Sequence, residues 1–236
     1  MEPKKGGIFG LLGAIILFLS VPFAISVSLA DFNTKYGLSL TFEQFLAFVQ
    51  EVSPELYVVI ISGIALDIIL GVLLALLGGL VMLRKSNDTI ATLMTFGGIV
   101  GSVSSFLLIG GIVGIIGAAL AIIGGGISSP AASLAPSEAL FVAEGTINGR
   151  DSADWIFCEN KFVIVRTASM TTGLIGGIII FLVAFMGIII GVGWLIGVIW
   201  AAIVGGIASW AFTTIQKNKN RRKLQGLSPD QILKAS

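Results

Sequence analysis

The sequence predicts an all-α polytopic membrane protein with about six transmembrane helices and a small three-stranded antiparallel β insertion. Of its 236 residues, 56% are hydrophobic and 11% are charged, whereas about 25% of the residues of a soluble domain are charged. Several apolar runs exceed the roughly 20 residues that cross a bilayer. Because this little polar surface cannot enclose a water-soluble particle, lipid is the expected solvent for most of the chain.

The first apolar run, Ile8–Leu29, directly follows a short basic segment. We interpret it as a retained first span. Lys4 and Lys5, together with Ser28-Leu29-Ala30, which resembles a cleavage site, also have the pattern of a secretory signal. That alternative stays open at the level of sequence.

An acidic connection separates the first run from the second. Within it, Thr41 and Gln44 have the spacing of a capping box, in which each side chain bonds the other residue's backbone N–H. Apolar residues then recur at helical spacing, which predicts an outer amphipathic helix over 41–52. A lid packed on the ends of the spans is preferred over a ligand-binding element. Ser53 and Pro54 suit the cap and first turn of the next helix.

The second apolar run, Tyr57–Leu83, is 27 residues long. A third apolar block, Thr89–Ile127, would be roughly 58 Å long as one helix, about twice the hydrocarbon thickness of roughly 30 Å. It is therefore expected to fold back near Leu108–Gly111. Residues 1–127 are thus predicted to form a four-span transmembrane bundle.

Residues 128–170 are expected to form a cytosolic linker and a small β-sheet. The linker is rich in Pro, Ala and Ser. Three runs then have the composition of strands, with a hairpin turn at Glu159–Asn160: Ala139–Ile147, Asp154–Cys158 and Lys161–Thr167. Three short strands are not stable alone, so the sheet should pack on the membrane helices or on a second copy.

Residues 171–214 should form a last transmembrane hairpin, followed by a basic cytosolic tail over 215–236. The apolar block would measure roughly 65 Å as a single helix. It is therefore expected to turn near Gly191–Gly193. Trp194 and Trp210 would then lie at opposite membrane faces, where indole rings are enriched.

The distribution of basic residues supports six crossings with both termini in the cytosol. In that arrangement every Lys and Arg except Lys35 lies on the cytosolic side, as the positive-inside bias predicts. The expected location is the plasma membrane of a prokaryotic cell. Five basic residues form the candidate contact to lipid headgroups or a partner: Lys217, Lys219, Arg221, Arg222 and Lys223. Each is worth on the order of 1 kcal/mol near an anionic leaflet, although a solvated anchor explains the cluster equally well.

Glycine is abundant, with 31 residues. Small residues let helix backbones approach closely in lipid, so tight helix packing within one chain or between copies is the preferred interpretation. The small-xxx-small pairs are Gly6 and Gly10, Gly97 and Gly101, Gly110 and Gly114, Gly173 and Gly177, Gly187 and Gly191, and Gly193 and Gly197.

Asp67 is the only ionisable side chain placed inside a predicted span. A charge at the bilayer centre costs at least roughly 2.5–3.5 kcal/mol, so the carboxyl is expected to be neutral. Candidate hydrogen-bond partners are four serines: Ser62, Ser102, Ser104 and Ser105. A packed neutral acid between helices is the preferred interpretation, and a proton or ion site is the alternative.

Residue types argue against catalysis, cofactors and metals. Histidine is absent, which removes the commonest general base and metal ligand. Cys158 is the only cysteine; without a histidine to activate it, it is interpreted as core filler rather than as a nucleophile. Neither a catalytic site, a cofactor site nor a nucleic-acid partner is expected.

Two parts of the chain resemble known families. Residues 1–127, with their acidic outer loop and the basic turn Arg84–Lys85, resemble a glycine-rich four-span family of prokaryotic membrane proteins of unknown function. Residues 139–167, above all Ala153–Thr167, resemble a hairpin of bacterial pleckstrin-like domains, and residues 227–234 resemble a later segment of some of them. The second resemblance implies a lipid- or peptide-binding role for this region.

Together these features indicate a non-catalytic integral membrane protein, a structural or accessory subunit. Its expected partners are the lipid bilayer, further copies of itself or other membrane subunits. The cytosolic sheet and the basic tail would face headgroups or a partner. The alternative is a small proton- or cation-coupled carrier or channel that uses Asp67.

Overall fold

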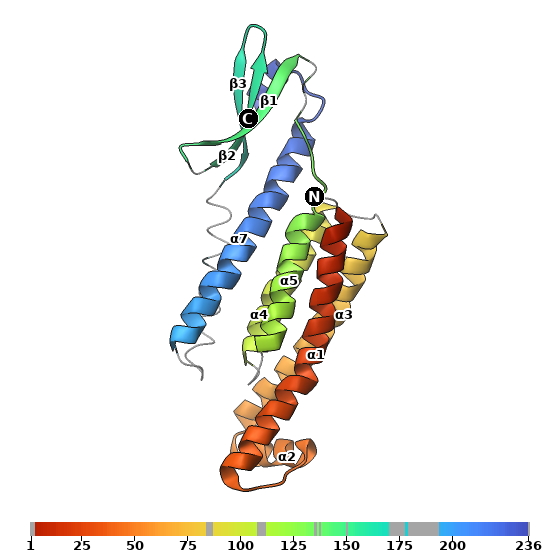
Figure 1. Cartoon of the computed structure of the whole chain (residues 1–236), viewed down its shortest axis with the longest axis vertical. Helices are drawn as coiled ribbons and strands as arrows, with labels where there is room; N and C mark the ends of the chain where they lie inside the picture. Colours follow the sequence, from red (N-terminus) through yellow and green to blue (C-terminus); the bar gives the residue numbers. More distant parts are fainter. Residues whose placement is uncertain are drawn as a thin grey trace.

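The computed structural model describes residues 3–83, 87–107, 112–134, 136, 138–149, 151–169, 178 and 194–235. It is mostly helical with a small three-stranded antiparallel sheet, which confirms this coarse part of the prediction. Long helices lie side by side along the molecule, the sheet lies at one end, and a short helix lies at the other (Figure 1).

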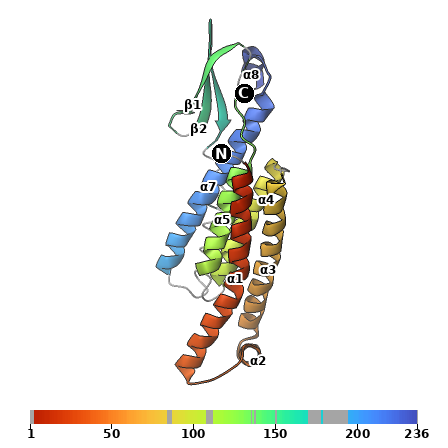
Figure 2. The same cartoon turned by 45° about the vertical axis from the view of Figure 1, so that its right-hand side comes forward.

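The helices are α1 (Pro3–Tyr36), α2 (Phe42–Val52), α3 (Pro54–Met82), α4 (Asp88–Leu107), α5 (Ile112–Ser128), α7 (Trp194–Leu224) and α8 (Pro229–Ala235). The strands are β1 (Ala139–Ile147), β2 (Asp151–Cys158) and β3 (Phe162–Ala168), and they pair in the order β1-β2-β3. Figure 2 shows α8 beside the upper end of α7, and α2 below α3 and beside the lower end of α1, where Phe32 contacts Phe45 and Phe48.

Two helix starts follow the predicted chemistry to different degrees. The capping box of α2 is confirmed, because Thr41 and Gln44 each bond the other residue's backbone N–H, at 2.9 and 3.3 Å. Ser53 does precede Pro54 at the start of α3, but its side chain makes no cap hydrogen bond. Ser53 also ends α2, where its own N–H donates to the carbonyl of Val49.

α4 and α5 lie antiparallel and in close contact. A Cβ added at Gly98 would lie 2.7 Å from the carbonyl of Ala118, and one at Gly125 would lie 2.7 Å from the carbonyl of Ala91. The residue numbers of these paired positions increase along α5 while they decrease along α4, which is the pattern of antiparallel helices. The predicted turn at Leu108–Gly111 lies outside the described residues, as does most of the predicted 171–193 half of the last hairpin.

Close backbone approach joins α1 to its two neighbours. A Cβ at Gly13 would lie 2.5 Å from the carbonyl oxygen of Gly117 in α5, and a Cβ at Gly78 in α3 would lie 2.9 Å from that of Gly7. The glycines of α1 that face α5 are seven residues apart, whereas the pairs predicted from the sequence are four residues apart. The predicted pair Gly6 and Gly10 nevertheless shares one neighbour, because a Cβ at Gly124 in α5 would lie 2.7 Å from the carbonyl oxygen of Gly6 and 2.8 Å from the backbone nitrogen of Gly10.

α7 continues unbroken through the predicted boundary at 214–215. Residues 215–224, assigned to a separate tail, are the last turns of α7, and α8 follows a short turn. Lower down, α7 packs on α5 through an apolar cluster of Ile122, Val204, Ala208 and Ala211. Trp194 and Trp210 both belong to this helix, roughly 24 Å apart along its axis.

The sheet has two different faces. Ile156, Val163 and Val165 are fully buried and form a cluster with Leu224 and Ile232 at the ends of α7 and α8. The opposite face carries rings in direct contact: Phe141 stacks on Phe157 at 4.2 Å between centroids, and Phe157 lies 4.7 Å from Phe162. We call Phe141, Trp155, Phe157, Phe162 and Ile164 the aromatic face.

The predicted strand bounds are close to those observed, and β2 differs most. It begins at Asp151, three residues before the predicted start, because Asp151 and Ser152 pair with Ile147 and Thr146 of β1. The hairpin turn at Glu159–Asn160 lies between β2 and β3 as predicted.

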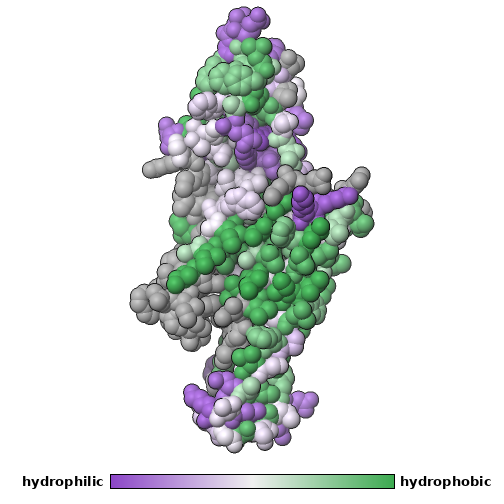
Figure 3. All heavy atoms as spheres, viewed as in Figure 1, coloured by the Kyte–Doolittle hydropathy of each residue, from purple (hydrophilic) through white to green (hydrophobic). Residues whose placement is uncertain are grey.

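By length and composition, α1 and α3 are the two helices within the described residues that could cross a membrane, and α5 contributes a shorter apolar helix. Hydrophobic surface covers the middle of the molecule in Figure 3, and hydrophilic residues gather at its two ends. These features favour membrane association, while the number of crossings stays a prediction.

Candidate functional site: the sheet–helix junction and the buried carboxyl

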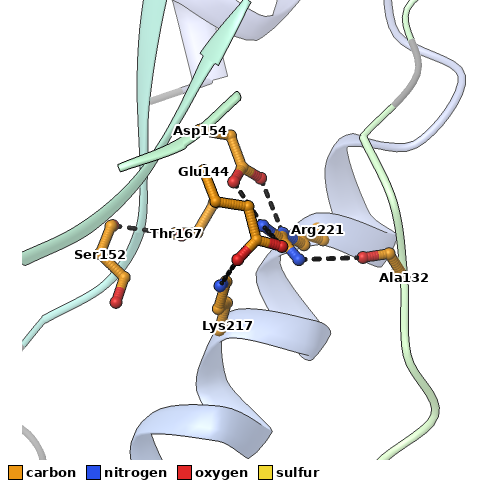
Figure 4. Close-up of polar contacts among 7 residues, drawn as sticks. All are labelled: Ala132, Glu144, Ser152, Asp154, Thr167, Lys217 and Arg221. Atoms are coloured by element: carbon orange, nitrogen blue, oxygen red, sulfur yellow. Dashed lines mark hydrogen bonds and ion pairs between the residues drawn. The ribbon is translucent and has the colours of Figure 1, made fainter. Parts of the chain in front are cut away.

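Four charged side chains meet where the sheet rests on α7 (Figure 4). Arg221 donates from Nε to Asp154 Oδ2 at 2.7 Å, and its Nη2 donates to the other carboxylate oxygen of Asp154. The same Nη2 lies 2.9 Å from Glu144 Oε1, and Lys217 Nζ lies 2.6 Å from Glu144 Oε2. We call Glu144, Asp154, Lys217 and Arg221 the sheet–helix clamp.

Local structure explains why these four side chains converge. Lys217 and Arg221 are four residues apart on α7 and therefore lie on one helix face. Glu144 and Asp154 are directly opposite each other in the β1–β2 ladder, so both side chains leave the same face of the sheet. A basic i, i+4 pair thus meets a cross-strand acidic pair.

Burial divides the clamp into a strong half and a weak half. The side chains of Asp154 and Arg221 are 0% and 9% exposed, whereas that of Glu144 is 63% exposed. Burial alone would lower the pKa of Arg221, but its hydrogen bonds to Asp154 and Glu144 outweigh this and raise it. The hydrogen bond from Lys217, and secondarily the contact with Arg221, hold the pKa of Glu144 below its ordinary value.

A second group of contacts ties α7 to the bundle. Arg222 forms an ion pair with Asp88 at the start of α4 and also donates to the carbonyl of Pro130. Ser129 donates to Asp88 at 2.9 Å, and Asn218 donates to the carbonyl of Ser129 at 3.3 Å. The C-terminal turns of α7 are therefore fastened both to α4 and to the segment that leads to the sheet.

The five basic residues of the predicted headgroup or partner contact are thus divided. Lys217, Arg221 and Arg222 are engaged within the chain. Lys219 and Lys223 are exposed and form no ion pair with the described residues. The acidic partners Glu144 and Asp154 were not predicted; the signal that could have found them is the acid pair opposite a basic i, i+4 pair.

Asp67 on α3 is fully buried against α4. Ser104 donates to Oδ1, and Ser105 donates to Oδ2 at 3.1 Å. The structure therefore brings two of the four candidate serines to this carboxyl. Ser102 instead donates to Ile99 in its own helix, and Ser62 is exposed.

The hydrogen-bond inventory around Asp67 favours its neutral form. The Ser104 hydroxyl also lies 3.1 Å from the carbonyl oxygen of Gly101. A hydroxyl has one proton, so Ser104 cannot donate to both acceptors. If Asp67 carries a proton, it donates to Ser104 while Ser104 donates to Gly101, and all three groups are satisfied.

Neighbouring small residues make room for this polar cluster. Gly114 of α5 lies against Ser105, and a Cβ there would also lie 2.8 Å from the Ser20 hydroxyl of α1. Ser20 itself is buried and donates to Leu17 of its own helix. Four helices therefore contribute to the surroundings of Asp67.

The described residues contain no group of three or more His, Cys, Asp or Glu side chains that could hold a metal ion. Cys158 is a half-buried free cysteine that packs at the edge of the buried sheet cluster. Comparisons with protein-family models, curated proteins and solved structures gave no match to this chain.

Proposed function

We propose that this chain is a non-catalytic integral membrane protein that acts as a structural or accessory subunit. The observation that carries the proposal is the sheet, which is fastened to α7 on one face and exposes the aromatic face on the other. Phe141 and Phe162 remain 55% and 49% exposed. Contiguous exposed apolar patches of this kind mark interaction sites.

The bundle surface supports placement in lipid. Large aliphatic side chains on α1 and α3, such as Leu19, Ile69 and Leu76, are at least 60% exposed. Moving apolar surface from water into an apolar environment is favourable by about 25 cal/mol per Å², so this exposed surface would be unfavourable in water. In a bilayer it faces its preferred solvent, and the glycine contacts provide the close approach that helices use there.

The charges at the two ends support six crossings with both termini in the cytosol. The N-terminus lies at the end of the bundle that faces the sheet (Figure 1), so exposed Lys4 and Lys5 share that end with the basic turns of α7. Exposed Glu43 and Glu51 of α2 lie at the other end. This is the asymmetry of the positive-inside bias, and it favours the plasma membrane of a prokaryotic cell.

The proposed partner is another membrane subunit whose cytosolic part covers the aromatic face. Purification from native membranes in mild detergent, followed by mass measurement of the complex, tests this. The double variant Phe141→Ser/Phe162→Ser should lose the co-purifying chain. Leu233→Ser, at a similarly exposed residue of α8, should retain it. A monomer from wild-type membranes would contradict the accessory role, and a mass of two or more copies would identify the partner as the chain itself.

A second candidate function is a small proton- or cation-coupled carrier or channel that uses Asp67. The observation that favours it is a fully buried carboxyl on a helix of the bundle. Its hydrogen bonds with Ser104 and Ser105 support the structural role instead. The protein in sealed liposomes should show no proton or cation flux above that of empty vesicles. Flux that Asp67→Asn abolishes would establish the carrier.

A further inference from the structure

A polar cavity of about 330 Å³ lies between the end of β3 and α7. Its lining is Arg166, Ala168, Ser169, Gln216 and Asn220. One strand end supplies the first three residues, and one face of α7 supplies the last two. Asn220 joins the two walls by donating to the carbonyl of Thr167 at 2.8 Å.

The cavity is suited to an anion. Arg166 is the only charged residue among the described residues that line it. Its contacts to Asp151 at 2.6 Å and to the Ser169 hydroxyl at 2.8 Å both use the same terminal nitrogen Nη2. A guanidinium has five N–H donors in a planar fork that matches phosphate oxygens. The remaining donors can therefore bind a phosphate while Asp151 fixes the orientation of the side chain.

The side-chain oxygen of Gln216, a hydrogen-bond acceptor in the lining of the cavity, lacks a donor among the described residues. This atom, Oε1, is buried. A buried polar atom that lacks a partner costs about 1–3 kcal/mol. A rotation of this amide toward a hydroxyl or ammonium group in the adjoining cavity would satisfy it.

The depth of the cavity fits a lipid headgroup. Thr213 and Thr214 bond the carbonyls of their own helix, at Ser209 and Trp210, and can therefore lie in an apolar layer. The apolar part of α7 ends at Ile215, and Gln216 begins the polar turns. In the proposed topology the cavity therefore lies at the boundary between hydrocarbon and water.

We infer that this cavity binds a phospholipid headgroup, with Arg166 on the phosphate and Gln216 on a hydroxyl or ammonium donor. The inference rests on the proposed function, because it needs α7 to cross the membrane. It assigns a specific lipid site to the C-terminal turns of α7, distinct from a diffuse attraction of the five basic residues to the leaflet.

The test uses the full chain in nanodiscs of mixed composition and counts retained lipids by native mass spectrometry. The wild type should retain phosphatidylglycerol and phosphatidylethanolamine, whose headgroups have donors, in preference to phosphatidylcholine, which has none. Arg166→Gln should lower the retention of all three about tenfold. Gln216→Leu should abolish the preference for headgroups with donors. Lys223→Gln, which removes one exposed charge from the same helix outside the cavity, should behave as wild type.

Each other outcome overturns the site. Equal lipid retention by the wild type, Arg166→Gln and Gln216→Leu would show that the cavity binds no lipid. An effect of Lys223→Gln as large as that of Arg166→Gln would show that the lipid is held by diffuse charge attraction and not by the cavity. Displacement of the lipid by millimolar glycerol phosphate would assign the site to a soluble phosphate ester. Resistance to alkaline extraction is measured in parallel, so that failure of the lipid site is separated from failure of the membrane proposal.

Discussion

Asp154 and Arg221 are the residues whose pairing most directly fixes the sheet on α7. Breaking a buried ion pair on one side leaves an uncompensated charge and costs about 3–5 kcal/mol. Asp154→Asn should therefore destabilise the sheet by that amount. Glu144→Gln, at the exposed half of the clamp, should cost about 0–1 kcal/mol.

Denaturant unfolding in detergent, followed by the fluorescence of Trp155, measures both variants against wild type. Because the chain has four tryptophans, the comparison uses a background in which the other three are replaced by phenylalanine. Equal destabilisation by Asp154→Asn and Glu144→Gln would contradict the division of the clamp into a buried and an exposed half.

Glu144 also predicts how the clamp responds to acid. Its pKa is lower in the folded chain than in the unfolded chain, chiefly because Lys217 donates to it. A carboxyl with a lowered pKa contributes its stability above its ordinary pKa of 4.5 and loses it as the pH falls through the folded value. The stability difference between wild type and Glu144→Gln should therefore be constant near neutral pH and vanish in acid. A stability difference that grows on acidification would show that folding does not lower the pKa of Glu144.

At the scale of single elements, α1 and α3 test the role of close backbone contact. Gly78 and Gly79 are neighbours on α3, but a Cβ at Gly78 would meet the backbone of α1 at 2.9 Å, and one at Gly79 would meet nothing within 4 Å. Gly78→Ala should destabilise the bundle by about 1–3 kcal/mol, the usual cost of overpacking. Gly79→Ala should stabilise it by about 0.5–1 kcal/mol, because alanine is the better helix former.

Thermal unfolding of the two variants in the same detergent checks this pair. The two substitutions add the same methyl group one residue apart, so composition and hydropathy are matched. Similar shifts of the midpoint in the same direction would show that α1 and α3 do not meet along this line.

The helix elements show which parts of packing can be predicted from sequence. Helix starts such as Thr41 and Gln44 depend on neighbours three residues apart, so local pattern is enough. Which glycines face one another depends on the partner helix, and Gly13 meets Gly117 across more than 100 residues. The seven-residue repeat of Gly6 and Gly13 opposite Gly117 and Gly124 is visible only once the pairing of α1 with α5 is known.

The same reasoning separates the two candidate sites. Asp67 could be predicted as a candidate because a lone carboxyl in an apolar run is conspicuous, and serines in a neighbouring run were natural donors. The clamp could not, because Glu144 and Asp154 look like ordinary polar residues of strands until the ladder places them side by side. From sequence, Arg221 and Lys217 are predicted to contact headgroups or a partner, or to be solvated, whereas in the structure they bind Asp154 and Glu144 of the sheet.

At the scale of the whole molecule, the topology predicts which positions are accessible from each side of the membrane. Single cysteines at Lys5, Lys223 and Glu43, introduced with Cys158→Ser, provide the test. In intact cells, a membrane-impermeant thiol reagent should label the cysteine at position 43 and not those at 5 and 223, because the proposed topology places the basic end in the cytosol. Permeabilised cells, in which all three should react, are the control. Labelling of positions 43 and 223 from the same side would overturn the arrangement.

The continuity of α7 has a mechanical consequence. This helix of 31 residues is about 46 Å long, and the clamp couples the sheet to its last turns. If a rigid helix of that length tilts by about ten degrees about its N-terminal end, its C-terminal end moves by about 8 Å. A partner bound to the aromatic face of the sheet would therefore be displaced by small reorientations of α7 that begin in the helix bundle.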